Sequence, residues 1–187
     1  TNSNNTTNST PSAPKSPNQT FQEVGVRSTY EVSEKVSVKG AVGMLFSQFQ
    51  DGDSKSPTLV FNAGGSWQPL ERTIISAEAY RRDYPSYSEA GQNYIATGLR
   101  TSVQQSFLEK YSATVALGYE NSDYSDAGDD DGTDRNDDYF WIRPSVEYQF
   151  NERVNCGVFY QFRTKSSSED SYDYSNNQLG LYANYRF

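Results

Sequence analysis

The sequence predicts an all-β fold, an antiparallel up-and-down meander of long strands, on three observations. Nine segments alternate between polar and apolar residues, as in YFWIRPSVEYQF from Tyr139 to Phe150. Each is about twice as long as an ordinary strand of roughly 5–6 residues. Tight turns and longer polar loops alternate between the segments, which is typical of consecutive hairpins.

The expected strands follow one another along the chain, and no segment of helical period competes with them. They cover residues 21–32, 35–49, 58–68, 72–83, 92–106, 110–122, 138–150, 153–165 and 175–187. Short turns follow the first, third, fifth and seventh strands: SEK, PLE, LEK and NER. Longer loops follow the second, fourth, sixth and eighth: QDGDSKSP, YPSYSEAG, DYSDAGDDDGTDRND and SSSEDSYDY. The sheet is therefore expected to have all its short turns at one end and all its longer loops at the other.

The composition does not match an ordinary soluble domain. Hydrophobic residues make up 34% of the chain, whereas a globular domain has roughly 45–50%. Aromatic residues nevertheless reach 14%, which excludes a wholly disordered chain. A low hydrophobic fraction together with a high aromatic fraction indicates a sheet whose interior is not apolar.

Charge and residue usage exclude several functions. The net charge is −8 without a basic stripe, so nucleic acid is not an expected partner. The chain has no histidine, which rules out Ser-His-Asp and Cys-His catalysis and any histidine-containing metal site. Cys156 is the single cysteine and lies between Val154 and Val158 on an apolar strand face, so we interpret it as a small buried hydrophobe. No apolar run is long enough for a transmembrane helix.

The two faces of the predicted strands differ along the whole sheet. One face mixes small residues with charges of both signs, and the other is apolar throughout. A soluble sheet of this kind needs a second layer, but no helix or second sheet remains in the sequence to supply it. Lipid supplies such a cover in a transmembrane β-barrel, where the apolar face points outward and the polar face lines the interior. We therefore expect the charged face to be the inside.

Strand length and aromatic placement support this orientation. The ten steps from Phe140 to Phe150, at roughly 3.3 Å each and tilted by about 40°, cover about 25 Å of bilayer. Outward aromatics gather near the strand ends, as in membrane proteins with aromatic belts. At the short-turn end they are Tyr30, Trp67, Phe107, Tyr111, Tyr148, Phe150, Tyr185 and Phe187. At the other end they are Phe46, Tyr119, Phe140, Tyr160 and Phe162.

The domain organisation is a tail followed by the barrel strands. Residues 1–20, rich in Asn, Thr, Ser and Pro, are expected to be a disordered tail or loop, and residues 21–187 to carry the strands. Nine is an odd number, whereas single-chain bacterial barrels have even counts. Either the chain is the C-terminal part of a larger barrel, which we favour, or strand one does not span and eight strands close without it.

The C-terminal segment LGLYANYRF carries the clearest resemblance to a known class. Leu181, Ala183, Tyr185 and Phe187 alternate toward lipid and end on a terminal aromatic. The chain here resembles bacterial outer-membrane β-barrel proteins, in which a terminal Phe on an alternating strand is the signal for the assembly machinery. The segments YRRDYPSY and SVEYQFNERVNCGVFYQF look like the Tyr-rich porins linked to exopolysaccharide gene clusters. The resemblance implies an outer-membrane location, contact with the lipid bilayer and lipopolysaccharide, and a link to polysaccharide export.

The acidic loop DYSDAGDDDGTDRNDD is the candidate metal site. Asp129, Asp131 and Asp134 offer clustered carboxylates with a glycine nearby, which would suit Ca²⁺. The EF-hand pattern fails, however, because Ala127 stands at the first ligand position and no Glu stands at the twelfth. We favour a solvated acidic loop that binds divalent ions loosely, and we expect no cofactor.

Charged residues on the inner face are the candidate functional residues, and two interpretations stay open. They either line a pore and select solutes, or pair across strands and fill a narrow barrel. The set comprises Arg27, Lys39, Glu78, Arg82, Arg100, Glu120, Arg143, Glu147, Arg163 and Arg186. Arg143 and Glu147 are roughly 13 Å apart along one strand, so each is expected to bond neighbouring strands.

The expected function is a passive, porin-like channel for small polar or anionic solutes, without enzymatic activity. Glu78 and Glu120 are the nearest to a catalytic carboxylate pair. The outer-membrane protease, phospholipase and palmitoyltransferase families, however, all use a catalytic His. One alternative is a closed structural or adhesion barrel that acts through its acidic, Tyr-rich loops. Another is a soluble ligand-carrying barrel with its apolar face inward. The sequence leaves the oligomeric state open.

Overall fold

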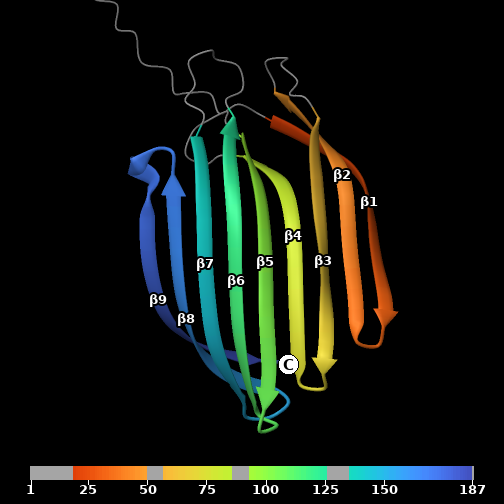
Figure 1. Ribbon diagram of the computed structural model, residues 1–187, viewed down its shortest axis with the longest axis vertical. Helices are drawn as coiled ribbons and strands as arrows, with labels where there is room; N and C mark the ends of the chain where they lie inside the picture. The colour runs from red at the N-terminus through yellow and green to blue at the C-terminus, as the bar shows by residue number, and fades with distance from the viewer. Residues whose placement is uncertain (1–18, 50–56, 86–92, 126–134, 187) are drawn as a thin grey trace, which may run out of the picture.

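The computed structural model describes residues 19–49, 57–85, 93–125 and 135–186. In these segments nine antiparallel strands form one sheet in the order β1 to β9, so the predicted meander is confirmed (Figure 1). The strands are β1 (Gln19–Ser33), β2 (Val36–Phe49), β3 (Thr58–Leu70), β4 (Thr73–Pro85), β5 (Asn93–Phe107), β6 (Tyr111–Ser125), β7 (Arg135–Gln149), β8 (Val154–Ser167) and β9 (Tyr174–Tyr185). A 3₁₀ turn, η1 (Asp170–Tyr172), lies between β8 and β9.

The strand boundaries lie within about two residues of the expected ones, except that the end of β6 and the start of β7 each extend three residues further. β1 begins at Gln19, inside the segment predicted to be a tail. β7 begins at Arg135, inside the segment predicted to be an acidic loop, because Arg135 pairs with Tyr124 of β6. The acidic composition concealed this extension, since charged residues are depleted in strands unless they are compensated. Asp137 is compensated here by Arg135 and Lys165.

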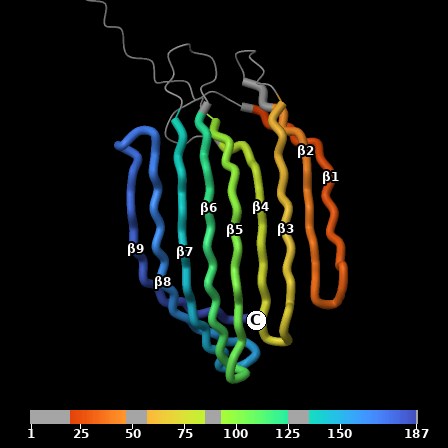
Figure 2. Tube along the Cα trace, viewed as in Figure 1, coloured from red at the N-terminus to blue at the C-terminus, as the bar shows by residue number. Residues whose placement is uncertain are grey.

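The short turns lie together at one end of the sheet, as predicted (Figure 2). In the β5–β6 turn, Leu108 and Glu109 have φ values of 50° and 56°. In the β7–β8 turn, the Asn151 side-chain oxygen accepts hydrogen bonds of 2.9 Å from the backbone N–H groups of Arg153 and Val154. The Asn151 side chain therefore stabilises the β7–β8 turn, whereas the β5–β6 turn places two L-residues in the left-handed region.

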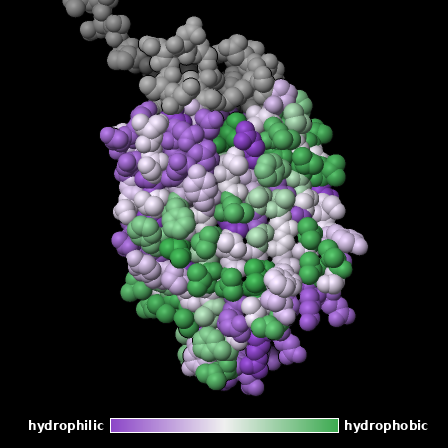
Figure 3. Space-filling model, in the orientation of Figure 1, coloured by the Kyte–Doolittle hydropathy of each residue, from purple (hydrophilic) through white to green (hydrophobic). Residues whose placement is uncertain are grey.

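The apolar face of the sheet is exposed. Val24 is 70% exposed and Leu181 is 84% exposed, and large hydrophobic residues of this face are exposed on every strand from β1 to β9 except β4. Apolar residues spread over the middle of the face seen in Figure 3, and hydrophilic residues gather at the short-turn end and over the far end of the C-terminal strands. A soluble monomer rarely exposes so large an apolar surface. This surface therefore needs a non-aqueous cover.

Aromatic side chains and polar groups mark the limits of the apolar surface. At the short-turn end, four aromatic rings form a continuous row. The ring centroids are 5.7 Å apart between Phe107 and Tyr111, 4.8 Å between Tyr111 and Tyr148, and 4.6 Å between Tyr148 and Phe150. At the other end, the Tyr119 hydroxyl donates to Asp138 Oδ1 at 2.6 Å. Both ends match the predicted aromatic positions.

The polar face is the concave one, since its side chains line the grooves of the curved sheet. A soluble carrier barrel needs the opposite arrangement, so that alternative is wrong. The few hydrophobic residues that are buried in the described part, among them Leu45, Val60 and Tyr80, also lie on this inner face. No helix in the described residues is long and apolar enough to span a membrane.

The sheet is open in the part of the chain that the structure describes. β1 pairs with β2 along its length, from Gln19 opposite Phe49 to Ser33 opposite Val36. The alternative in which eight strands close without strand one is therefore not the arrangement found. β1 and β9 are the two edges, and they run in the same direction because successive strands alternate.

Candidate functional site on the inner face

Cross-strand register brings the predicted charged residues into neighbouring rows on the inner face. Lys39 lies opposite Gly64, Gly64 opposite Glu78, and Glu78 opposite Arg100. The next row contains Arg27, Tyr80 and Glu120. Arg82, Arg143, Glu147 and Arg163 lie on the same face of β4, β7 and β8, and Arg186 follows the end of β9. Period-two alternation thus placed these residues on the correct face.

A chain of polar contacts fixes the charges of β2 to β6. Lys39 Nζ lies 3.6 Å from Glu78 Oε2, and the Asn62 amide donates a short hydrogen bond to Glu78 Oε1. Arg100 donates to the Tyr80 hydroxyl at 3.0 Å, and that hydroxyl donates to Glu120 Oε2 at 2.5 Å. Two of these contacts join adjacent strands, and the other two, from Lys39 to Glu78 and from Tyr80 to Glu120, each pass over one intervening strand, so the side chains lie along the wall.

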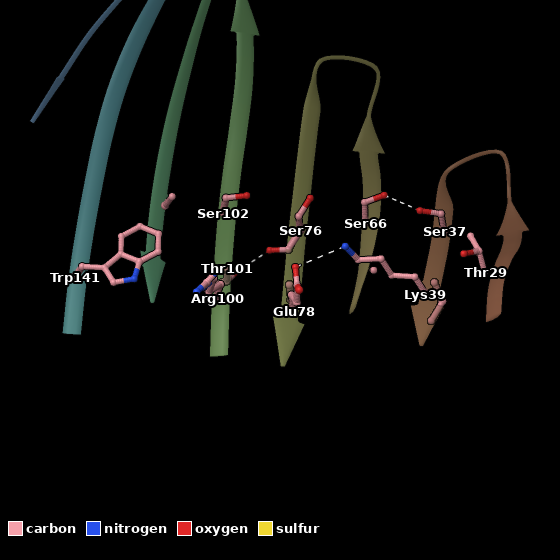
Figure 4. Close-up of a pocket in the computed structure, with 14 residues that line it drawn as sticks. Thr29, Ser37, Lys39, Ser66, Ser76, Glu78, Arg100, Thr101, Ser102 and Trp141 are labelled. Atoms are coloured by element: carbon pink, nitrogen blue, oxygen red, sulfur yellow. Dashed lines mark hydrogen bonds and ion pairs between the residues drawn. The ribbon is translucent and has the colours of Figure 1, made fainter. Parts of the chain in front are cut away.

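An open groove of about 420 Å³ runs across this part of the wall. Figure 4 shows Lys39, Glu78 and Arg100 beside a row of hydroxyl groups. The row consists of Ser37, Ser66, Ser76 and Ser102, in which Ser37 Oγ and Ser66 Oγ are 2.8 Å apart. These serines are not among the predicted site residues. Their signal was present, since three of them stand two residues from a predicted charged residue on the same strand.

Four aromatic rings lie flat on the inner face, each over a glycine of the adjacent strand. The pairs are Tyr80 over Gly98, Trp141 over Gly118, Tyr182 over Gly157 and Phe159 over Gly180. A Cβ built on any of these glycines would overlap the ring above it. Glycine therefore lets the large rings pack against the wall instead of projecting from it.

A buried ionic cluster lies on the same face near the long-loop end. Asp137 is 2% exposed and accepts contacts from Lys165 Nζ at 2.6 Å, Ser167 Oγ at 2.5 Å and Arg135 Nε at 3.4 Å. The Arg135 guanidinium lies between two rings, 3.6 Å from the Tyr124 centroid and 4.0 Å from that of Tyr172. This cluster joins β6, β7 and β8 to η1. The acidic composition around Arg135 and Asp137 predicts a loop, so the sequence gives no sign of this cluster.

Some of the predicted residues lie outside the described part of the chain. The candidate Ca²⁺ ligands Asp129, Asp131 and Asp134 are among them, as is Phe187. Within the described segments, no group of three or more His, Cys, Asp or Glu residues gathers as a metal site. Leu181 and Ala183 lie on the outer face of β9, and Tyr185 ends that strand.

An antiparallel meander with an apolar outer face, aromatic borders and a charged inner face defines the wall of a membrane β-barrel. The model of the family described as Putative beta-barrel porin 2 matches residues 4–187. The chain belongs to this family, and the resemblance seen in the sequence is confirmed.

A solved structure supports the same architecture. The chain is similar to in-vitro folded OmpT, an outer membrane protein of Vibrio cholerae, with a TM-score of 0.58 and 14% sequence identity. The similarity covers 89% of this chain and 55% of that one, so the chain spans about half the length of its structural neighbour. A search of the curated proteins finds no match.

Proposed function

We propose that this chain forms the wall of a passive, porin-like channel for small polar solutes in a bacterial outer membrane. The observation that carries the proposal is the arrangement of the inner face. Its charges contact neighbours along the wall, and its large rings lie flat on glycines. Both features leave space in front of the wall.

The number of strands matters for this proposal, because an eight-stranded interior is just filled by side chains. An open lumen needs more than about ten strands. The described sheet has nine strands and two edges. Further strands between β9 and β1 would close a barrel wide enough to conduct.

The outer face supports the expected partners. Its apolar surface would contact the bilayer, and its aromatic borders would lie at the head groups and lipopolysaccharide. We keep Leu181, Ala183, Tyr185 and Phe187 as the proposed signal to the assembly machinery. We also propose that the acidic loop binds Ca²⁺ loosely and that the protein needs no other cofactor.

The proposed function is non-enzymatic. Glu78 contacts Lys39 and Asn62, and Glu120 accepts the hydrogen bond of Tyr80. Each carboxylate is therefore committed to a cross-strand contact, and the two do not form the facing pair that general acid–base chemistry needs.

A structural or adhesion barrel is the second candidate, and one observation favours it. The cluster around Arg135 and Asp137 holds η1 firmly against the long-loop end of the sheet. A rigid attachment of η1 to the sheet would help a barrel that binds its partners through the loops at this end. This function tolerates a filled barrel, whereas the channel does not.

Single-channel recording of the native, full-length product in a planar bilayer tests the proposal. We expect steady openings whose conductance grows with salt concentration. Heat-denatured protein is the control and should give none. A silent bilayer with correctly folded, heat-modifiable protein would contradict the channel and favour the loop-binding barrel.

A further inference from the structure

We propose that Arg143 and Arg163 form an oxyanion-binding subsite on the wall of β7 and β8, which takes the carboxylate or phosphate group of a small solute. The inference rests on the proposed channel, because it places the subsite on a solute path. It adds a defined position and a ligand chemistry to that function.

The register places the two guanidinium groups on one face of adjacent strands. Arg163 lies opposite Trp141, and Arg143 is two residues beyond Trp141 on the same face of β7. Arg143 and Arg163 are therefore diagonal neighbours, with Cα atoms about 7–8 Å apart. Two guanidinium groups at this spacing can reach one oxyanion together.

Neither arginine has a counter-ion in the described part of the chain, where no carboxylate lies within 4.0 Å of Arg143 or Arg163. Among the other inner cations, Lys39 contacts Glu78, and Arg135 and Lys165 share Asp137. Arg27, Arg82 and Arg100 also have no carboxylate within 4.0 Å in the described residues, but none of these three is a diagonal neighbour of another, as Arg143 and Arg163 are. The residues directly beside the arginine pair are neutral: Trp141, Gln161, Asn176 and Gln178. The nearest charged groups further along the same face have other partners, since Lys165 pairs with Asp137 and Glu147 accepts a hydrogen bond from the Tyr182 hydroxyl.

Both guanidinium groups are held at the wall. The Arg143 guanidinium carbon is 3.9 Å from the centroid of Phe159, whose ring lies over Gly180. Arg163 Nε is buried and has no hydrogen-bond partner among the described residues. Two half-buried like charges repel each other, and an anion between them would remove that repulsion. Arginine also presents a planar fork of donors that fits carboxylate and phosphate.

The subsite also gives the wall an uneven field. On the inner face of β1 to β6, the four cations Arg27, Lys39, Arg82 and Arg100 are matched by Glu23, Glu31, Glu78 and Glu120. On the inner face of β7 and β8, Arg135, Arg143, Arg163 and Lys165 outnumber Asp137 and Glu147. The excess of positive charge is thus on β7 and β8, where it would draw anions to one side of the lumen.

Trp141 provides a test that does not depend on conductance. The chain has two tryptophans, and the other, Trp67, lies on the outer face. The Trp67→Phe variant of the full-length product, folded in detergent, reports from Trp141 alone. We expect titration with succinate or inorganic phosphate to change its fluorescence in a saturable way. Adding Arg143→Gln and Arg163→Gln should raise the half-saturating concentration at least tenfold.

The matched control is Arg27→Gln with Arg82→Gln in the same background, which removes two cations from other strands of the same face. It should move the half-saturating concentration less than threefold. Equal effects of the two double variants would overturn the subsite and leave only a general field. A titration without saturation in the folded Trp67→Phe protein would also overturn it. Parallel titrations decide whether carboxylate or phosphate is preferred.

Bilayer recording separates this inference from the channel itself. In a conducting native protein, succinate or phosphate should reduce the chloride current with saturation, and Arg143→Gln/Arg163→Gln should abolish that block while openings persist. A silent bilayer with a saturable Trp141 signal would contradict the channel and keep the binding subsite. Normal openings without an anion signal in either assay would keep the channel and refute the subsite.

Discussion

The indole of Trp141 lies flat against Gly118 of the neighbouring strand, where a Cβ would overlap the ring. This packing holds Trp141 at the wall beside the groove formed by Lys39, Glu78 and Arg100.

Gly118→Ala should displace the Trp141 ring from the wall, because the added methyl group occupies the space of the indole. We expect a shift in Trp141 emission in the Trp67→Phe background and a loss of stability of about 1–3 kcal/mol, typical of overpacking. Gly40→Ala is the control, since a Cβ at Gly40 meets nothing within 4 Å. An unchanged Trp141 spectrum in Gly118→Ala would show that the ring does not depend on this glycine.

Asp137→Ala should be strongly destabilising, because it leaves the buried Arg135 and the partly buried Lys165 without their shared carboxylate. Breaking a buried ion pair from one side costs about 3–5 kcal/mol. Denaturant unfolding in detergent measures the change. Lys39→Gln is the comparison, since the Lys39 and Glu78 side chains are 56% and 30% exposed. Such an exposed pair contributes about 0–1 kcal/mol. Equal losses of unfolding free energy in Asp137→Ala and Lys39→Gln would contradict the stronger role of the buried cluster.

Leu108→Asn combined with Glu109→Gly should stabilise the β5–β6 hairpin. Both positions have positive φ, which costs an ordinary L-residue about 1–2 kcal/mol and glycine almost nothing. We expect a higher unfolding midpoint in denaturant. Glu34→Gly, in the β1–β2 turn, serves as the control because Glu34 has no positive φ. A gain in Glu34→Gly as large as in the double variant would mean that backbone strain is not the cause.

Val146→Arg should be costly in a bilayer, whereas Ser145→Arg should be tolerated. The two residues are adjacent on β7 and face opposite sides of the sheet near the middle of the apolar band. A charged residue on the lipid face near the midplane costs about 2–4 kcal/mol. Unfolding from lipid vesicles compares the pair directly. Similar losses in both variants would contradict the assignment of lipid to the outer face.

Period-two alternation made the two faces predictable from the sequence. It placed Arg143 and Glu147 on one face of β7 and Val146 on the other, and the strand boundaries agree within about two residues except at the ends of β6 and β7. It could not show that Asp137 belongs to a strand, because the carboxylate is compensated by Lys165, 28 residues further along the chain. Composition alone indicates a loop there.

The sequence by itself determined the meander, its long strands, its two unlike ends and which face is charged, because each follows from local alternation and turn residues. Only the tertiary structure decided which residues meet across strands. Register pairs Glu78 with Lys39, lays Trp141 on Gly118 and leaves Arg143 and Arg163 without a described counter-ion. These contacts depend on turn geometry and strand pairing between distant parts of the chain, which local alternation does not encode.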